Sequence, residues 1–246
     1  MNRKEFIVTS TLAVLASTLV GCHRTRNFRF TKNQVIGCFG DSITAAKNGY
    51  VSMLQETYAK LEPEMGLRFL NYGQSSETVT GLTEEIHPGP RPYLFERLDN
   101  ELDKEPIDVA LFCYGINCGI YGEPSQKLFD GFKTGVYTFL EKMRQREIGT
   151  ILLTPPPLAL EAQIFDDTAH IDYYGYLNPY PKYDEEVLQI FKEIILQINH
   201  PSVLKKIDIH TPLLQRQMSC YDEDPIHPNA TGHRLIANAI VKKLSV

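Results

Sequence analysis

Short apolar runs alternate with longer amphipathic stretches along most of the chain. The apolar runs predict strands at residues 34–39, 67–72, 108–114, 150–154 and 206–210. The amphipathic stretches predict helices at residues 49–61, 91–103, 125–146, 184–199 and 228–244. Strands that alternate with helices in this way are typical of βαβ units. The pattern therefore predicts an α/β fold, a three-layer α/β/α sandwich built on a flavodoxin-like sheet of five parallel strands.

The N-terminus follows a different pattern. Arg3 and Lys4 precede an apolar stretch at residues 6–20, which is too short to span a membrane and is typical of a signal peptide. It is followed by LVGC, which ends at Cys22 and resembles the bacterial lipobox, a pattern whose cysteine is lipidated and becomes the mature N-terminus. An ordinary secretory signal cut after a small residue is the alternative.

These features predict the organisation of the chain and its location. We expect a signal peptide at residues 1–21, a polar leader at 22–33 and one globular domain at 34–246. The mature protein is then an exported lipoprotein, anchored to a membrane through Cys22, in the periplasm or at the cell surface.

Composition narrows the class of partner. The 246 residues are 43% hydrophobic and 22% charged, which is enough to bury the core of a single domain. The formal net charge is −5, so the chain lacks the basic surface that a nucleic-acid binder needs to neutralise phosphates. We expect no nucleic-acid partner.

Four segments that follow predicted strands contain residues suited to chemistry. They are GDS at residues 40–42, NYGQSS at 71–76, YGINCG at 114–119 and DEDPIHP at 222–228. In an open parallel sheet, ligands bind beyond the carboxyl ends of the strands. These four segments should therefore meet at one edge of the sheet.

The residue types at this edge fit acyl transfer. A serine hydroxyl needs a base to take its proton, and the base needs a carboxylate to orient it; Ser42, His227 and Asp224 offer these three groups. An oxyanion needs N–H donors, which the backbone of Ser42 and Gly73 and the amide of Asn117 could supply. Taken one at a time, each residue also fits a turn, a loop or the start of the last helix.

The order of these segments resembles that of the SGNH hydrolases, also called GDSL esterases and lipases. GDSIT at residues 40–44 matches the nucleophile block, Gly73 the glycine block, GIN at 115–117 the asparagine block and DPIHP at 224–228 the block of the acid and the base. The resemblance spans nearly the whole mature chain. One departure is that Cys118 stands where the family usually has aspartate after the asparagine.

The resemblance implies a role for each residue. Ser42 would be the nucleophile, His227 the base and Asp224 the residue that orients it. Ser42, Gly73 and Asn117 would form the oxyanion hole. The family needs no cofactor for this chemistry, and we expect no metal: a cluster of acids and a histidine at residues 166–172 is better explained as solvated loop.

The remaining cysteines leave one question open. Cys38 and Cys113 lie in apolar runs, where a free buried thiol is ordinary packing. Only Cys118 and Cys220 could form a disulfide, and connectivity cannot be determined from sequence.

Three functions remain in competition. The first is a serine esterase that removes short acyl groups, acetyl above all, from carbohydrates. The second is a lysophospholipase or thioesterase that acts on longer acyl chains. The third is a surface lipoprotein that binds glycans without turnover. The long segment at residues 155–182, rich in proline and tyrosine, follows the fourth predicted strand and could form a wall of the substrate site.

Overall fold

The computed structural model describes residues 28–162 and 179–244. The signal peptide, Cys22 and the first half of the polar leader lie outside the described residues, as does the acidic cluster at residues 166–172.

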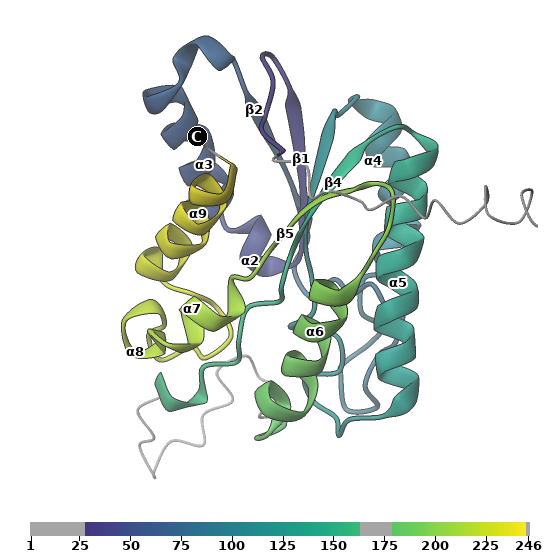
Figure 1. Ribbon diagram of the computed structural model, residues 1–246. Helices are drawn as coiled ribbons and strands as arrows, with labels where there is room; N and C mark the ends of the chain where they lie inside the picture. The colour runs from purple at the N-terminus through teal and green to yellow at the C-terminus, as the bar shows by residue number, and fades with distance from the viewer. Residues whose placement is uncertain (1–27, 163–178, 245–246) are drawn as a thin grey trace, which may run out of the picture.

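Five parallel strands form one sheet, and this confirms the predicted fold class (Figure 1). The strand order is β2-β1-β3-β4-β5. The strands are β1 Val35–Gly40, β2 Arg68–Gly73, β3 Val109–Cys113, β4 Gly149–Leu153 and β5 Val203–Ile207. The first four lie within one residue of the prediction at each end. The central strand β3 is buried along its whole length, as its apolar sequence requires.

Helices and short helical turns connect the strands. The α-helices are α2 Ser42–Ala45, α3 Tyr50–Leu61, α4 Leu98–Lys104, α5 Gln126–Gln145, α6 Gln189–Gln197, α7 His210–Leu214, α8 Gln217–Cys220 and α9 Ala230–Leu244. Shorter turns are the 3₁₀ segments η1 Pro63–Met65, η2 Leu94–Glu96 and η3 Leu160–Ala162, and the π-helical segment η4 Asp184–Leu188 that runs into α6.

The order of the strands reverses at β1, and this places the helices in two layers. Helices α3 and α9 lie on one side of the sheet, and α4, α5 and α6 lie on the other (Figure 1). Crossovers between parallel strands are right-handed, so a change of direction along the sheet moves the connecting helix to the opposite face. The chain therefore leaves β1 and β3 toward opposite faces, which opens a crevice at their carboxyl ends.

Two predicted elements differ from the structure. The helix expected at residues 91–103 begins only at Leu98, because Thr78 and Tyr93 form a parallel bridge that keeps the preceding chain extended. The last strand begins three residues earlier than predicted and ends at Ile207. It lies at the edge of the sheet, where residues such as Lys205 and Lys206 are only half-buried, so its apolar pattern is weak.

The core between the sheet and α5 is aromatic. Phe139 of α5 contacts Phe39 of β1 and Phe112 of β3, with ring centroids 5.5 and 4.8 Å apart. Phe132, about two turns earlier on α5, stacks on Phe191 of α6 at 3.9 Å. These contacts fix the helices on this face against the two strands whose ends define the crevice.

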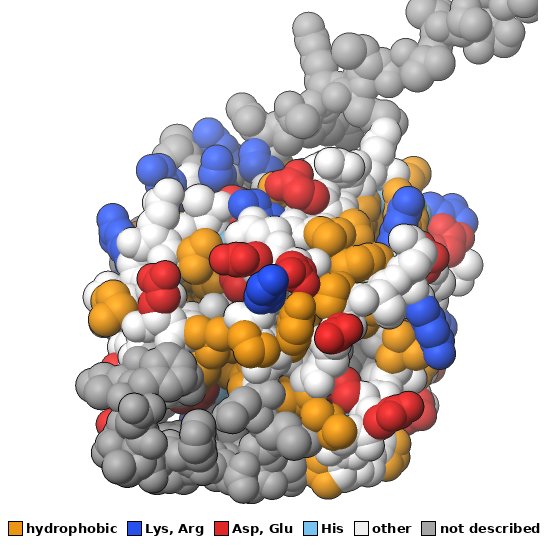
Figure 2. Space-filling model, turned by 90° about the horizontal axis from the view of Figure 1, so that it is seen from below, with side chains coloured by type: hydrophobic (Ala, Val, Ile, Leu, Met, Phe, Trp, Pro, Cys, Tyr) orange, Lys and Arg blue, Asp and Glu red, His pale blue; other side chains and the backbone are white. Residues whose placement is uncertain are grey.

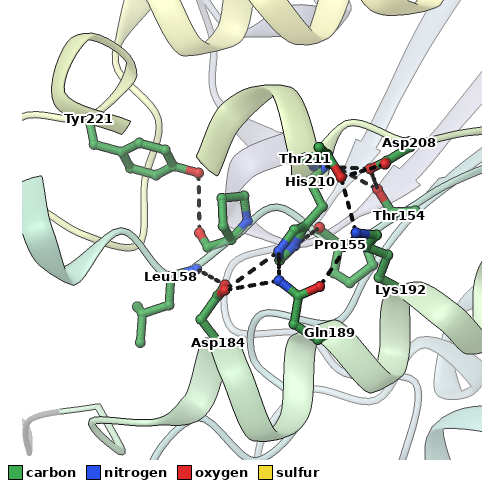
Figure 3. A network of polar contacts seen from close by, with 11 residues as sticks. Thr154, Pro155, Leu158, Asp184, Gln189, Lys192, Asp208, His210, Thr211 and Tyr221 are labelled. Carbon is green, nitrogen blue, oxygen red and sulfur yellow. Dashed lines mark hydrogen bonds and ion pairs between the residues drawn. The ribbon is translucent and has the colours of Figure 1, made fainter. Parts of the chain in front are cut away.

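A buried polar network lies beyond the carboxyl ends of β4 and β5 (Figure 3). The ring of His210 is fully buried; its Nδ1 lies 3.1 Å from the Pro155 carbonyl oxygen and its Nε2 lies 2.9 Å from Gln189 Nε2. Asp184 accepts the Leu158 N–H at 3.0 Å. The network joins the chain after β4, the start of α6 and the chain after β5, so His210 has a structural role.

The described residues were compared with the expectations about disulfides, metal sites and membrane-spanning helices. Cys118 and Cys220 are buried free thiols, as are Cys38 and Cys113, so the disulfide that the sequence left open is not formed. Within residues 28–162 and 179–244, no cluster of three or more potential ligands could hold a metal ion. None of the helices in this part of the chain is long and apolar enough to cross a membrane.

Candidate active site

Ser42 begins α2 directly after β1 ends. The carboxylate of Asp41 caps this helix by accepting the Ile43 N–H at 3.0 Å. Gly40 leaves no room for a side chain, because a Cβ atom there would lie 2.7 Å from the Cys113 carbonyl oxygen. The strand thus stops at a glycine so that the next residues can turn into a helix. The backbone N–H of Ser42 lies in the first turn of that helix, where it has no intrahelical partner.

Ser42 and His227 are joined by a hydrogen bond. Ser42 Oγ lies 2.7 Å from His227 Nε2, and His227 Nδ1 lies 2.6 Å from Asp224 Oδ2. A carboxylate can only accept, so Nδ1 carries the ring proton and Nε2 is left to accept from the serine hydroxyl. The structure brings together the three residues that the sequence predicted for nucleophile, base and acid.

The loop between α8 and α9 holds the carboxylate rigidly. Asp224 Oδ1 accepts the N–H groups of Ile226 at 2.8 Å and of His227 at 3.3 Å. The side chains of Asp224 and His227 are 19% and 33% exposed, so the ring is open to a ligand on one side while the acid is largely shielded.

The charges around His227 raise its pKa. Burial by itself lowers the pKa of the imidazole, but the hydrogen bond and the charge of Asp224 outweigh burial, and the charge of Asp41 adds to them. The pKa of His227 therefore lies above its ordinary value. The arrangement stabilises the imidazolium that forms when the ring takes a proton.

Asn117 lies on the loop after β3 with an unused donor. Its side chain is buried, and its Nδ2 has no hydrogen-bond partner among the described residues. The loop around it is fixed by Tyr183, whose hydroxyl donates to the carbonyl oxygens of Gly115 and Cys118 at 3.0 and 2.9 Å. A buried amide donor without a partner costs free energy, and native structures contain few such groups.

Gly73, one of the three residues predicted for the oxyanion hole, has a backbone N–H that is bound within the chain. It ends β2 opposite Gly40, and its N–H is donated to Asn71 Oδ1 at 2.9 Å. A Cβ atom at this position would lie 2.6 Å from Ala45 Cα. Glycine is therefore needed here because α2 packs directly on the end of β2. Its N–H already has an acceptor.

Cys118, the departure from the family pattern, is accommodated in the interior. Its side chain is fully buried, and the backbone N–H of Val79 lies beside its sulfur. Burial raises the pKa of the thiol to about 12, so the side chain is uncharged. The thiol connects the loop after β3 to the chain after β2.

Sequence reasoning treated Asp41 as a turn residue and passed over Glu77. Both carboxylates are about 1% exposed. Burial raises the pKa of Asp41 to about 7, and its Oδ2 has no hydrogen-bond partner among the described residues. Glu77 lies in the turn after β2. The burial of Asp41 and Glu77 cannot be inferred from the sequence, because aspartate and glutamate are also common in exposed turns.

A cavity of about 350 Å³ lies beside the Asn117 loop. Its walls are the segments at residues 82–86 and 119–128, and none of the five predicted site residues lines it. Figure 2 shows the face of the molecule at the carboxyl ends of the strands. Hydrophobic side chains form a band on this face, and acidic side chains lie among them.

Comparison with known proteins defines the class. The model of the GDSL-like lipase/acylhydrolase family matches residues 38–235. The chain belongs to this family, as the resemblance of its sequence predicted, and is therefore a carboxylic ester hydrolase. No curated protein matches the chain in sequence.

Solved structures share the fold at low sequence identity. An alpha/beta hydrolase enzyme from the metagenome of Lake Arreo, Spain, is 20% identical, with 87% of this chain and 96% of that chain covered and a TM-score of 0.62. An acetylxylan esterase from Geobacillus stearothermophilus is 18% identical, with 89% and 97% covered and a TM-score of 0.63.

Proposed function

We propose that the protein is a serine esterase that uses Ser42, His227 and Asp224. The observation that carries this proposal is the continuous chain of two short hydrogen bonds, 2.7 and 2.6 Å long, from the serine hydroxyl to the largely shielded carboxylate of Asp224. Nucleophile, base and orienting acid within hydrogen-bond reach are the signature of covalent acyl transfer.

Each residue has a distinct part in the reaction. His227 Nε2 takes the proton of Ser42 as its Oγ attacks the acyl carbonyl carbon, and a tetrahedral intermediate forms. His227 then gives the proton to the departing alcohol, leaving an acyl group on Ser42. A water molecule, deprotonated by the same ring, attacks this acyl group and frees the serine. Asp224 stays ionised and stabilises the charged imidazole.

Two donors are available for the oxyanion of the intermediate. Asn117 Nδ2 has no hydrogen-bond partner among residues 28–162 and 179–244, and the Ser42 N–H lies at the start of α2. Donors that are fixed before the reaction stabilise developing charge without a cost of reorganisation. The Gly73 N–H would have to leave Asn71 Oδ1 before it could take part.

We propose neutral carbohydrate esters with a short acyl group, such as acetyl, as substrates. The exposed carboxylates of Asp222 and Glu223 flank the Asp224–His227 loop, and the chain has a formal net charge of −5. This field disfavours the phosphate groups of lysophospholipids and of coenzyme A thioesters. The likeness in fold to an acetylxylan esterase is consistent with a sugar ester.

We also propose that Cys22 carries a lipid. The LVGC letters and the short apolar stretch before them support an exported, membrane-anchored protein. The ester hydrolase domain would then work in the aqueous space next to the membrane.

A serine-reactive fluorophosphonate tests the proposed function. We expect one covalent adduct, on Ser42, formed in parallel with loss of turnover, and none in the Ser42→Ala variant. Turnover should be higher with 4-nitrophenyl acetate than with long-chain 4-nitrophenyl esters, and acetylated xylooligosaccharides should release acetate. An enzyme that prefers long acyl chains would overturn the substrate proposal. A parent protein that neither reacts with the probe nor hydrolyses any ester would support glycan binding without turnover.

A further inference from the structure

A second buried acid lies next to the proposed site. The carboxylate of Glu77 accepts two hydrogen bonds from Arg97, both at 2.7 Å, and one from the Tyr114 hydroxyl at 2.5 Å. Arg97 also donates to the carbonyl oxygen of Tyr72 at 2.6 Å. The cluster thus fastens the turn that carries Glu77 to the last residues of β2.

This turn lies between the segments that carry the nucleophile and Asn117. It begins with a hydrogen bond from the Gln74 N–H to the Gly40 carbonyl oxygen at 2.9 Å, two residues before Ser42. It closes with the Glu77 N–H donated to the Gln74 carbonyl oxygen at 3.2 Å. Two residues later, the Val79 N–H lies beside the side chain of Cys118, the neighbour of Asn117. The turn therefore spans the crevice at the ends of β1 and β3.

Ser76, inside this turn, has an unusual backbone. Its φ of 61° lies in the left-handed region, which few residues other than glycine adopt. Its backbone N–H makes no hydrogen bond within the described residues. Strained residues persist only where the surrounding structure holds them, and they gather at functional sites.

We propose that Glu77, held by Arg97 and Tyr114, is a positioning residue that keeps Ser76 in this conformation so that its backbone N–H donates to the oxyanion. This inference rests on the proposed function. The Ser76 N–H supplies the donor that Gly73 does not, since the Gly73 N–H is already bound by Asn71. A charged cluster suits this task because the bidentate Arg97 contact fixes the carboxylate in one geometry.

A second buried ion pair provides a matched control. Arg91 binds Glu84 with bonds of 2.6 and 3.0 Å, and both side chains are less exposed than 10%. This pair lies farther along the same connection between β2 and α4; Glu84 also accepts the Tyr121 N–H at 3.3 Å, so the pair holds the chain after the Asn117 loop and makes no contact with the turn at residues 74–77. Breaking either pair leaves a buried carboxylate without its cation, so both changes should lower stability to a similar extent.

The experiment compares Arg97→Met and Glu77→Gln with Arg91→Met. We expect all three to lower Tm, on the order of 10 °C for the arginine variants. Only Arg97→Met and Glu77→Gln should lower kcat for 4-nitrophenyl acetate, by roughly tenfold or more at nearly constant KM, and slow fluorophosphonate labelling in parallel. Equal kcat in all three variants after correction for folded fraction, or an equal loss in all three, would overturn the proposal.

Substitutions at Ser76 test the donor itself. Ser76→Gly keeps the N–H and favours positive φ, so we expect kcat within about twofold of the parent. Ser76→Val disfavours that conformation and should lose kcat as Glu77→Gln does. A large loss in Ser76→Gly would show that the hydroxyl matters and would overturn the backbone assignment. If the parent itself is not labelled at Ser42, the proposed function fails; if it is labelled and Glu77→Gln reacts at the parental rate, only this inference fails.

Discussion

The hydroxyl of Ser42 lies 2.7 Å from the ring of His227, although the two residues are 185 positions apart in the chain. One follows the first strand and the other immediately precedes the last helix, so the contact exists only when the whole sheet is assembled. The packing of α9 on α3 holds the two segments in register. The geometry of the proposed site thus depends on the folding of nearly the entire described chain.

The pH dependence of turnover should follow the ionisation of His227. The ring must be neutral to accept the proton of Ser42, and its raised pKa means that this form is lost on acidification at a higher pH than for a free histidine. The acidic limb of kcat/KM should therefore have its midpoint above about 6.5. Asp224→Asn removes the charge that raises the pKa, so the limb should move to lower pH while kcat falls. A limb that stays in place would contradict the assigned contact.

The amide of Asn117 should contribute to kcat rather than to substrate binding. Asn117→Ala is expected to lower kcat by on the order of 10² to 10³, or about 3 to 4 kcal/mol, because the donor acts on charge that appears only in the transition state. KM and Tm should change little, since Nδ2 has no partner to lose in the resting structure. Steady-state kinetics and thermal unfolding measure these effects. A raised KM with kcat intact, or a large fall in Tm alone, would instead indicate a role in supporting the loop.

Much of this architecture could be predicted from the sequence because buried strands leave a strong signal. Apolar runs indicate the strands β1 to β4. The polar residues that follow β1 and β3 allowed Ser42 and Asn117 to be predicted as site residues. The edge strand β5 was predicted three residues too late in the chain, because Lys205 and Lys206 interrupt its apolar pattern. The helices α2, α7 and α8 have only four or five residues, too few for a helical periodicity to show.

The contacts that position the site could not be predicted in the same way. Glu77 and Arg97 are 20 residues apart and are joined by tertiary packing, which no local pattern reveals. Gly73 was expected to face the oxyanion, but the orientation of the Asn71 side chain decides where its N–H is donated. Burial and side-chain direction, rather than residue type, determine which polar residues act together.

The close packing of α2 on β2 should make Gly73 intolerant of any side chain. Gly73→Ala would place a Cβ atom 2.6 Å from Ala45 Cα, so α2, and Ser42 with it, must shift. We expect a loss of about 1 to 3 kcal/mol in the free energy of unfolding together with a fall in kcat. Gly131→Ala in α5 is the control, because its Cβ would have no neighbour closer than 3.6 Å; stability there should be unchanged or slightly raised. Similar behaviour of both variants would contradict the packing argument.

The predicted lipid anchor should depend on Cys22 alone. In a bacterial host that processes lipoproteins, Cys22→Ser should move the protein from the membrane fraction to the soluble fraction and abolish incorporation of labelled fatty acid. The esterase activity per molecule should not change, because residue 22 lies outside the domain that contains Ser42. Retention of the variant in the membrane at high salt, to the same extent as the parent, would show that another feature holds it there.

His233 should make the fold sensitive to mild acid independently of turnover. Its ring is buried against Tyr50, and its Nδ1 accepts the Tyr50 N–H at 3.2 Å, which requires the neutral form. Burial first, and then the neighbouring charge of His227, lower the pKa of His233 to about 4. In the unfolded chain the same ring takes up a proton below about pH 6.5. Between these two values the unfolded state binds more protons, so the free energy of unfolding must fall as the pH falls.

The size and origin of this loss can be measured with one substitution. Since one pKa unit corresponds to about 1.4 kcal/mol, His233 contributes at most about 3 kcal/mol to the loss of stability between pH 6.5 and pH 4. His233→Asn offers an amide oxygen to the Tyr50 N–H and does not titrate. Urea unfolding of the two proteins should show a shallower decline with acidification in the variant, even if its stability at pH 7 is lower because the smaller side chain packs less well. Parallel declines in parent and variant would mean that other groups cause the acid sensitivity and that His233 is not held neutral by the fold.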